Sequence, residues 1–160
     1  MIVLFRALTY ATLFVGLLLV FVPDQILAPA GIVRPAVIGP IHIVAMLVVV
    51  AGAALAIASI LTFAFVGKGT PAPFDPPRKL VVAGPYRWVR NPMYIGAGLV
   101  LLGAAMFYGS IWLVLYTMAF WSAAHLFVLF YEEPVLRRKF GADYDAYIAT
   151  RRRWMPRWRS

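Results

Sequence analysis

The feature that most constrains the fold of this chain is a stretch of 40 residues, from Pro92 to Tyr131, that contains no Lys, Arg, Asp or Glu. The whole chain of 160 residues is 63% hydrophobic and only 13% charged, whereas water-soluble domains are normally about half apolar. About 20 helical residues cross a hydrocarbon layer of roughly 30 Å. The stretch is therefore long enough for two crossings and indicates an integral membrane protein.

Two further apolar blocks precede this stretch. Ile2–Val22 and Val37–Val66 are each long enough to span a bilayer. Within the uncharged stretch, Tyr108-Gly109-Ser110 has the composition of a tight turn between two short spans. We therefore predict an all-α integral membrane helical bundle with four transmembrane helices, followed by short cytoplasmic helices at the C-terminal end.

Basic residues are distributed unevenly among the connecting segments. The segment 23–36 contains one arginine, whereas the segment 67–91 contains five Lys and Arg residues and the tail after residue 131 contains still more. By the positive-inside rule, both termini and the middle loop are expected to be cytoplasmic. The net charge is +9, and the basic residues cluster beside the predicted spans. This position favours contact with anionic membrane lipids and argues against a nucleic-acid partner.

The chain, residues 1–160, reads as a single membrane domain with two dissimilar halves. Residues 1–66 hold few polar groups, and Gly and Ala recur in the segment 51–58, a composition that lets helices approach closely in lipid. We expect this half to be a two-span scaffold. Residues 67–160 hold nearly all the polar and aromatic detail, so function is expected there.

The numbers of Cys and His residues limit which disulfide, catalytic and metal sites this chain can form. The chain has no cysteine, which excludes disulfides, thiolate catalysis and zinc-thiolate sites. Its two histidines do not share a cluster of acids, so no metal site is expected.

Asn91-Pro92 marks the expected start of the third span. Asn is a preferred N-cap residue and Pro is favoured at the first helical position. A helix N-terminus also attracts anions, because it gathers unpaired N–H groups. With Arg87 and Arg90 nearby, the same residues suit the carboxylate or phosphate of a small ligand.

Three small or polar positions within the spans allow two interpretations. Gly96 and Gly98 can serve close helix packing, or they can leave room for a flat ligand ring. His125 lies two turns before Glu132 on roughly the same helical face, where it can face a neighbouring helix or the ligand.

Glu132 and Glu133 form a pair of carboxylates at the end of the fourth span. The negative end of the helix dipole makes this position unfavourable unless something compensates the charge. Basic side chains at positions 137–139 are one candidate, and a cationic ligand with an ammonium or sulfonium group is another.

The tail beyond these glutamates is expected to form two short helices. Pro134 suits the first turn of one helix, Gly141 its end, and Asp143 the cap of the next. On the second helix Tyr144 and Tyr147 fall on one face. With the arginines at one side and the glutamates at the other, a polar chamber that suits a zwitterionic cofactor is predicted at the cytoplasmic ends of spans three and four.

Two longer patterns in this half resemble the isoprenylcysteine carboxyl methyltransferases and the related phospholipid methyltransferases, over about residues 84–158. The pattern G-P-Y-x-x-x-R-H/N-P-x-Y is matched by Gly84, Pro85, Tyr86, Arg90, Asn91, Pro92 and Tyr94. The pattern E-E-x-x-L-x-x-x-F/Y-G-x-x-Y-x-x-Y is matched by Glu132, Glu133, Leu136, Phe140, Gly141, Tyr144 and Tyr147, and a closing R-x-x-P by Arg153 and Pro156.

This resemblance implies a membrane methyltransferase that uses S-adenosylmethionine (SAM) and a lipophilic or prenylated acceptor. Glu133 and a basic partner, Arg138, are predicted to orient or deprotonate the acceptor. The residues predicted to contact SAM are Tyr86, Arg87, Arg90, Asn91, Pro92, Tyr94, Gly96, Gly98, His125, Glu132, Glu133, Tyr144, Tyr147 and Arg153.

The acceptor and the enzyme class have alternatives. Many relatives that methylate carboxyl groups have His where this chain has Asn91, so a phospholipid N-methyltransferase is the alternative to an isoprenylcysteine carboxyl O-methyltransferase. Some membrane sterol reductases share a related C-terminal architecture with a nicotinamide cofactor. A small transporter or assembly factor would usually carry an acid inside its spans, and the four predicted spans contain none.

Overall fold

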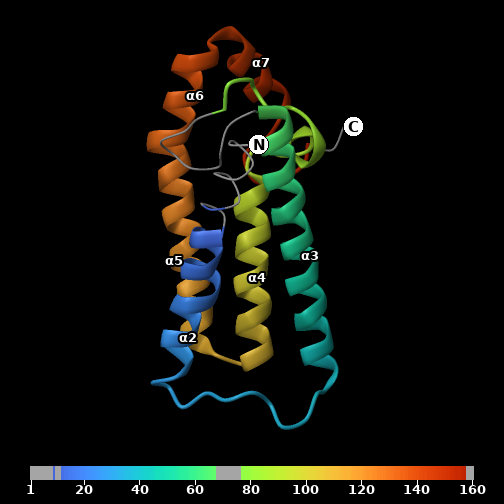
Figure 1. The fold of residues 1–160 in the computed structure, drawn as a ribbon, viewed down its shortest axis with the longest axis vertical. Helices are drawn as coiled ribbons and strands as arrows, with labels where there is room; N and C mark the ends of the chain where they lie inside the picture. Colours follow the sequence, from blue (N-terminus) through green and yellow to red (C-terminus); the bar gives the residue numbers. More distant parts are fainter. Residues whose placement is uncertain (1–8, 10–11, 68–76, 158–160) are drawn as a thin grey trace.

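In the computed structural model the described residues are 9, 12–67 and 77–157, and every regular element among them is helical. Figure 1 shows an elongated bundle in which α3 (Pro40–Thr62), α4 (Pro92–Tyr108) and α5 (Ile111–Phe127) run side by side. The shorter α2 (Val22–Leu27) packs beside α5. The predicted all-α class is confirmed.

Small residues bring α3 and α4 into backbone contact. A Cβ added at Gly96 would lie 2.6 Å from the backbone nitrogen of Ala56 and from the carbonyl oxygen of Gly52, and a Cβ at Gly103 would lie 2.9 Å from the carbonyl oxygen of Ala45. No side chain fits between these backbones, because real Cβ contacts are longer. Close packing is the role that the geometry gives to Gly96.

The prediction of four spans is confirmed only in part. The helical runs Pro40–Gly67 and Ile111–Phe140 are long and apolar enough to cross a membrane, whereas Thr12–Leu27 and Pro92–Tyr108 are apolar but shorter. At 1.5 Å per residue, α4 reaches about 25 Å, less than the roughly 30 Å of a hydrocarbon core. Much of the first predicted span, Ile2–Val22, lies outside the described residues.

The predicted turn between the third and fourth helices is confirmed. Gly109 ends α4 with a φ of 58°, a left-handed conformation that glycine adopts without steric cost. Ser110 then caps α5, because its hydroxyl oxygen accepts a hydrogen bond of 3.3 Å from the backbone N–H of Leu113.

The sequence predicts that the fourth span ends at the two glutamates, but the helix continues past them. α5 continues through a π-helical turn, η4 (Val128–Glu132), into α6 (Glu133–Phe140). Pro134 lacks an N–H and would crowd the carbonyl four residues earlier in an α-helix, and a π turn placed directly before it relieves that conflict. Another π turn, η1 (Gly16–Phe21), ends two residues before Pro23.

Gly141 ends this long helix, as predicted, with a φ of 51°. The next helix, α7 (Ala142–Thr150), begins at once, so Asp143 lies in its first turn and is not its cap. The capping prediction for Asp143 is therefore wrong, although an acid in the first turn still suits the helix dipole. Tyr144 and Tyr147 are both buried on one face of α7, as the periodicity predicted.

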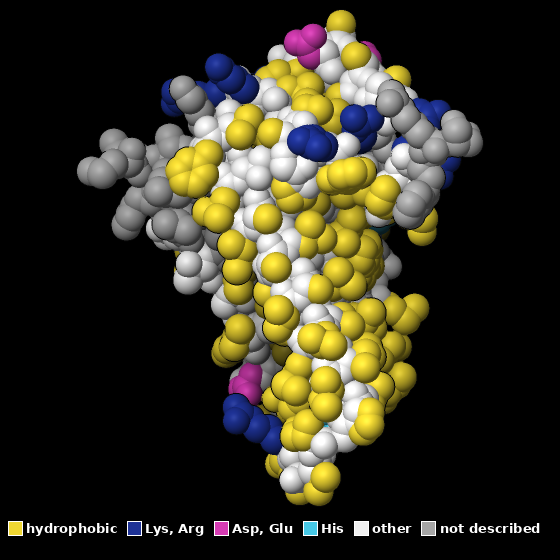
Figure 2. Space-filling model, turned by 90° about the vertical axis from the view of Figure 1, so that its right-hand side faces the viewer, with side chains coloured by type: hydrophobic (Ala, Val, Ile, Leu, Met, Phe, Trp, Pro, Cys, Tyr) yellow, Lys and Arg dark blue, Asp and Glu magenta, His cyan; other side chains and the backbone are white. Residues whose placement is uncertain are grey.

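The polar and apolar surfaces divide the molecule along its length. Figure 2 shows a broad hydrophobic middle with charged side chains gathered toward the ends, most of them at the end that carries α6 and α7. Large side chains in the middle are widely exposed, including Leu47 and Val50, each 64% exposed. An apolar surface of this extent requires a nonpolar surrounding, which agrees with a membrane location.

Candidate active site

A cavity lies at the end of the bundle where α6, α7 and η3 (Gly84–Arg87) meet. Its empty volume is about 410 Å³, and this volume includes space that is open to solvent. Seven of the described residues that line it were predicted from the sequence: Tyr86, Arg90, Asn91, Glu132, Glu133, Tyr144 and Tyr147. They come from segments up to 61 residues apart in the chain, and the fold brings them together.

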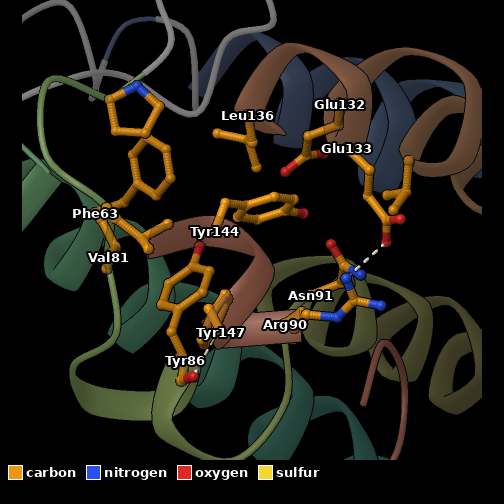
Figure 3. A pocket seen from close by; sticks show the side chains of 13 residues that line it. Phe63, Val81, Tyr86, Arg90, Asn91, Glu132, Glu133, Leu136, Tyr144 and Tyr147 are labelled. Carbon is orange, nitrogen blue, oxygen red and sulfur yellow. Dashed lines mark hydrogen bonds and ion pairs between the residues drawn. The ribbon is translucent and has the colours of Figure 1, made fainter. Parts of the chain in front are cut away.

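The cavity has an apolar side and a charged side. Figure 3 shows Phe63 and Val81 on one side, Arg90 and Glu133 on the other, and the ring of Tyr144 between them. A ligand that fills this space therefore meets rings and aliphatic groups at one end and ionic groups at the other.

Glu133 is held by two arginines. Arg153 donates from Nε to Oε1 at 2.6 Å and from Nη2 to Oε2 at 2.9 Å, and Nη1 of Arg90 lies 3.1 Å from Oε1. This bidentate pairing is the strong form of a charge-assisted hydrogen bond, and it raises the pKa of the Arg153 guanidinium. The two guanidinium groups compensate the charge of this carboxylate, which belongs to the first residue of α6.

The sequence analysis predicted Arg138 as the basic partner of Glu133, and the structure shows other partners. Arg138 is exposed on the last turn of α6, whereas Arg90 and Arg153 make the ion pairs with Glu133. The pairing of Glu133 with Arg138 is therefore corrected. The reason is that Arg153 returns to the cavity only after α7, a long-range arrangement that local spacing does not reveal.

Glu132 has a different environment from its neighbour. Its Oε2 accepts a hydrogen bond of 3.1 Å from the hydroxyl of Tyr94, and it lines the cavity. Among the described residues no Lys or Arg forms an ion pair with it. Within the described part of the chain, guanidinium groups thus neutralise the carboxylate of Glu133, and none neutralises that of Glu132.

The guanidinium of Arg90 has an unused donor. Its side chain is only 8% exposed, and within the described part of the chain its Nε finds no hydrogen-bond acceptor. A buried donor left unpaired costs free energy, and such groups in native proteins call for an explanation such as a bound partner. Because Arg90 lines the cavity, a ligand with an anionic oxygen would supply the missing acceptor.

The three tyrosines of the cavity keep their protons. Burial raises the pKa of Tyr144 to about 12, and the charge of Glu133 raises it further in the same direction. Burial also raises the pKa of Tyr86 and Tyr147. The hydroxyl of Tyr147 donates a 2.8 Å hydrogen bond to the carbonyl oxygen of Tyr86, which ties α7 to η3.

Asn91 occupies the N-cap position of α4, but its side chain does not bond to the N–H groups of the first turn. Its Nδ2 instead donates to the carbonyl oxygen of Arg153 at 3.3 Å. The side-chain capping interpretation is therefore wrong: the buried amide holds the tail, while Pro92 starts the helix as predicted.

Several predicted site residues contact protein and do not line the cavity. Arg87 is exposed, and Gly96 packs against α3. Gly98 faces the indole of Trp121, and Nδ1 of His125 accepts a hydrogen bond from Trp154. Tyr94 and Arg153 reach the cavity indirectly, through the two glutamates.

The residues that sequence reasoning missed are apolar: Phe63, Pro77, Leu80, Val81, Val128 and Leu136. Leu136 belongs to the second sequence pattern, which was its only signal. Phe63 comes from the half assigned to the scaffold, so that half contributes directly to the cavity. Apolar residues in an apolar chain give no local sign that they face a ligand.

Comparison with known proteins gives one family. A family model described as phospholipid methyltransferase matches residues 40–143. Neither the search of curated proteins nor the search of solved structures gives a match. The matched residues cover α3, α4, α5 and α6 with the two glutamates, and they amount to more than half of the chain. The chain belongs to the phospholipid methyltransferase family, a family of membrane methyltransferases that act on lipid-type substrates.

Proposed function

We propose that this protein uses SAM to methylate a lipophilic acceptor at the cytoplasmic edge of the membrane. The observation that carries the proposal is a pair of unsatisfied groups in one cavity. Glu132 has no cationic partner among the described residues, and Arg90, although it is paired with Glu133, keeps a buried Nε without an acceptor among them. SAM carries both complementary groups, since it has a sulfonium, an ammonium and a carboxylate. Family membership supports methyl transfer itself.

The chain's own residues would divide the work of binding. Arg90 and Asn91 would hold the carboxylate of SAM, and Glu132 would attract its positive charge. Tyr144 offers a protonated hydroxyl and a ring in the middle of the cavity. When bound, SAM supplies an electrophilic methyl group, and positioning of the acceptor in a cavity shielded from water would supply much of the rate enhancement.

The first candidate acceptor is a lipid-linked carboxylate, as in the isoprenylcysteine carboxyl methyltransferases. In this case the buried Nε of Arg90 would orient the acceptor carboxylate, and Asn91 would be left to hold the carboxylate of SAM. Such a nucleophile is already ionised at neutral pH. Glu133 and Arg153 would then serve to fix Arg90 in place.

The second candidate acceptor is the amine of a phospholipid headgroup. Glu132 favours it, because a lipid ammonium must lose a proton before it can attack, and a carboxylate without a cationic partner can accept that proton. The two candidates thus depend on different residues of the same cavity.

Methyl-labelled SAM distinguishes these acceptors. Purified protein is reconstituted in vesicles that contain either phosphatidylethanolamine or a prenylated cysteine, and labelled lipid is treated with base. A methyl ester releases volatile label, whereas an N-methyl group retains it. Absence of lipid label with both acceptors would contradict the proposal, and calorimetric binding of NADPH without binding of SAM would favour a reductase.

A further inference from the structure

The segment that follows α7 is tied to the rest of the cavity by its backbone. Arg151 leaves the helical conformation, and the next two carbonyl groups both accept hydrogen bonds from the start of α4. The N–H of Arg90 donates to the carbonyl oxygen of Arg152 at 3.0 Å, and Nδ2 of Asn91 donates to that of Arg153 at 3.3 Å. The position of this segment therefore decides where the Arg153 guanidinium meets Glu133.

Trp154 fastens the same segment to α5. Its Nε1 donates a 3.1 Å hydrogen bond to Nδ1 of His125, and its ring meets that of Trp121 edge to face with centroids 5.4 Å apart. An indole N–H has one donor and no acceptor, so His125 supplies what this half-buried side chain requires. Residues 125 and 154 are thus paired across 29 positions of sequence.

Gly98 makes room for this arrangement. A Cβ added at Gly98 would overlap the indole of Trp121, which is rigid and cannot yield as a flexible side chain would. Helix α4 therefore makes room for Trp121, and Trp121 and His125 together hold Trp154. We name His125, Trp121 and Gly98 the tryptophan seat.

We propose that the tryptophan seat sets the Arg153–Glu133 pair by fixing Trp154, so that His125 and Trp154 are positioning residues for the cofactor. This inference rests on the proposed function for its kinetic consequence, but not for its structural one. Arg153 is 29% exposed, so water competes for its guanidinium. Without the seat, the segment keeps the hydrogen bonds from the Arg90 backbone N–H and from the Asn91 side chain, and Arg153 spends part of its time away from Glu133.

The matched variants at position 125 are His125→Leu and His125→Asn. Leucine keeps apolar volume but removes the acceptor, whereas the Oδ1 of asparagine can replace Nδ1. We expect His125→Leu to raise the KM for SAM about tenfold, the effect of one lost hydrogen bond, with a smaller change in kcat. His125→Asn should remain within about threefold of the parent protein. Ser122→Ala, an exposed position on the same helix, is the control and should leave the KM unchanged.

Trp154→Phe tests the same contact from the other side. Phenylalanine keeps a ring against Trp121 but has no N–H to donate. If the hydrogen bond is the relevant contact, the double variant with His125→Leu raises the KM no further than either single variant, because both remove one interaction. Additive effects would overturn the proposed coupling.

Hydrogen exchange supplies a readout that needs no SAM. The backbone N–H of Arg90 donates to the carbonyl oxygen of Arg152, so its exchange in the SAM-free protein should be faster in His125→Leu and Trp154→Phe, and restored in His125→Asn. Equal exchange in all variants would overturn the proposal, as would equally fast exchange in His125→Asn. If the parent protein fails to bind SAM, the proposed function falls, while the exchange experiment still decides the role of the seat.

Discussion

The middle of the bundle and the cavity end are held together by different means. In the middle, α3 and α4 meet backbone to backbone at Gly52 and Gly96, and the described ion pairs all lie elsewhere. At the cavity end, Glu133 gathers Arg90 and Arg153 from distant parts of the chain. Lipid tails are as apolar as side chains, so close fit must hold helices within the bilayer, whereas directional polar contacts can hold them at its edge.

The largest effect should come from breaking the charge network. Glu133→Gln leaves two arginines without their carboxylate, one of them only 8% exposed. We expect a loss of about 3–5 kcal/mol in the free energy of unfolding and a fall in methyl transfer of at least about a hundredfold. Thermal unfolding and labelled-SAM turnover check this. Near-normal activity in a folded variant would show that the network is not the centre of the site.

A slightly smaller loss of stability is expected when a side chain is added at the contact between α3 and α4. In Gly96→Ala the new Cβ would lie 2.6 Å from the backbone of α3, and overpacking of this kind costs about 1–3 kcal/mol. The unfolding midpoint should fall while turnover per folded molecule changes little. Gly16→Ala is the control, because a Cβ there meets no atom of the described residues within 4 Å. Equal behaviour of the two variants would contradict the backbone contact.

A single polar contact at the cavity end should matter less. Tyr147→Phe removes the 2.8 Å hydrogen bond to the carbonyl oxygen of Tyr86 but keeps the ring. The expected loss is about 1 kcal/mol in the free energy of unfolding, or somewhat more because the carbonyl is left buried. Chemical unfolding measures it. A loss as large as that of Glu133→Gln would mean that the hydroxyl has a further role.

The smallest effect is expected for Arg138→Gln, and a comparison with Arg153→Gln tests which arginine is the partner of Glu133. Arg138 is exposed and Arg153 makes the bidentate pair. Arg138→Gln should change the KM for SAM by less than about threefold, since exposed charges contribute little, whereas Arg153→Gln should raise it by tenfold or more. The opposite ranking would restore the partner that sequence spacing first suggested.

The cavity end was more predictable than its apolar lining. Glu133 stands out because only 13% of the residues are charged, and helical spacing places Tyr144 and Tyr147 on one face. Phe63 and Val81 carry no such signal, because apolar residues surround them in the sequence. Their role depends on how α3 ends beside η3, which only the fold reveals.

The helix boundaries show the same division between local and long-range causes. Gly109 and Gly141 were predicted to end helices, and their positive φ angles explain why glycine is needed. Pro134 lies in the first turn of α6, as predicted, but a π turn joins that helix to α5 without a break. Asn91 has a residue type that favours N-capping, yet its side chain donates a hydrogen bond to the distant carbonyl oxygen of Arg153.

Helix α4 is shorter than the continuous helical runs on either side of it, which include η2 (Phe63–Gly67) on one side and η4 and α6 on the other. It has 17 residues, while the helical runs beside it have 28 and 30, and its first residue lies next to the cavity. A bilayer responds to such hydrophobic mismatch by thinning or by letting headgroups sink toward the deficient segment. If α4 lies within the bilayer, we expect a local dip in the lipid surface at the cavity mouth. An acceptor could present its reactive group there while its acyl or prenyl chain stays dissolved in the leaflet.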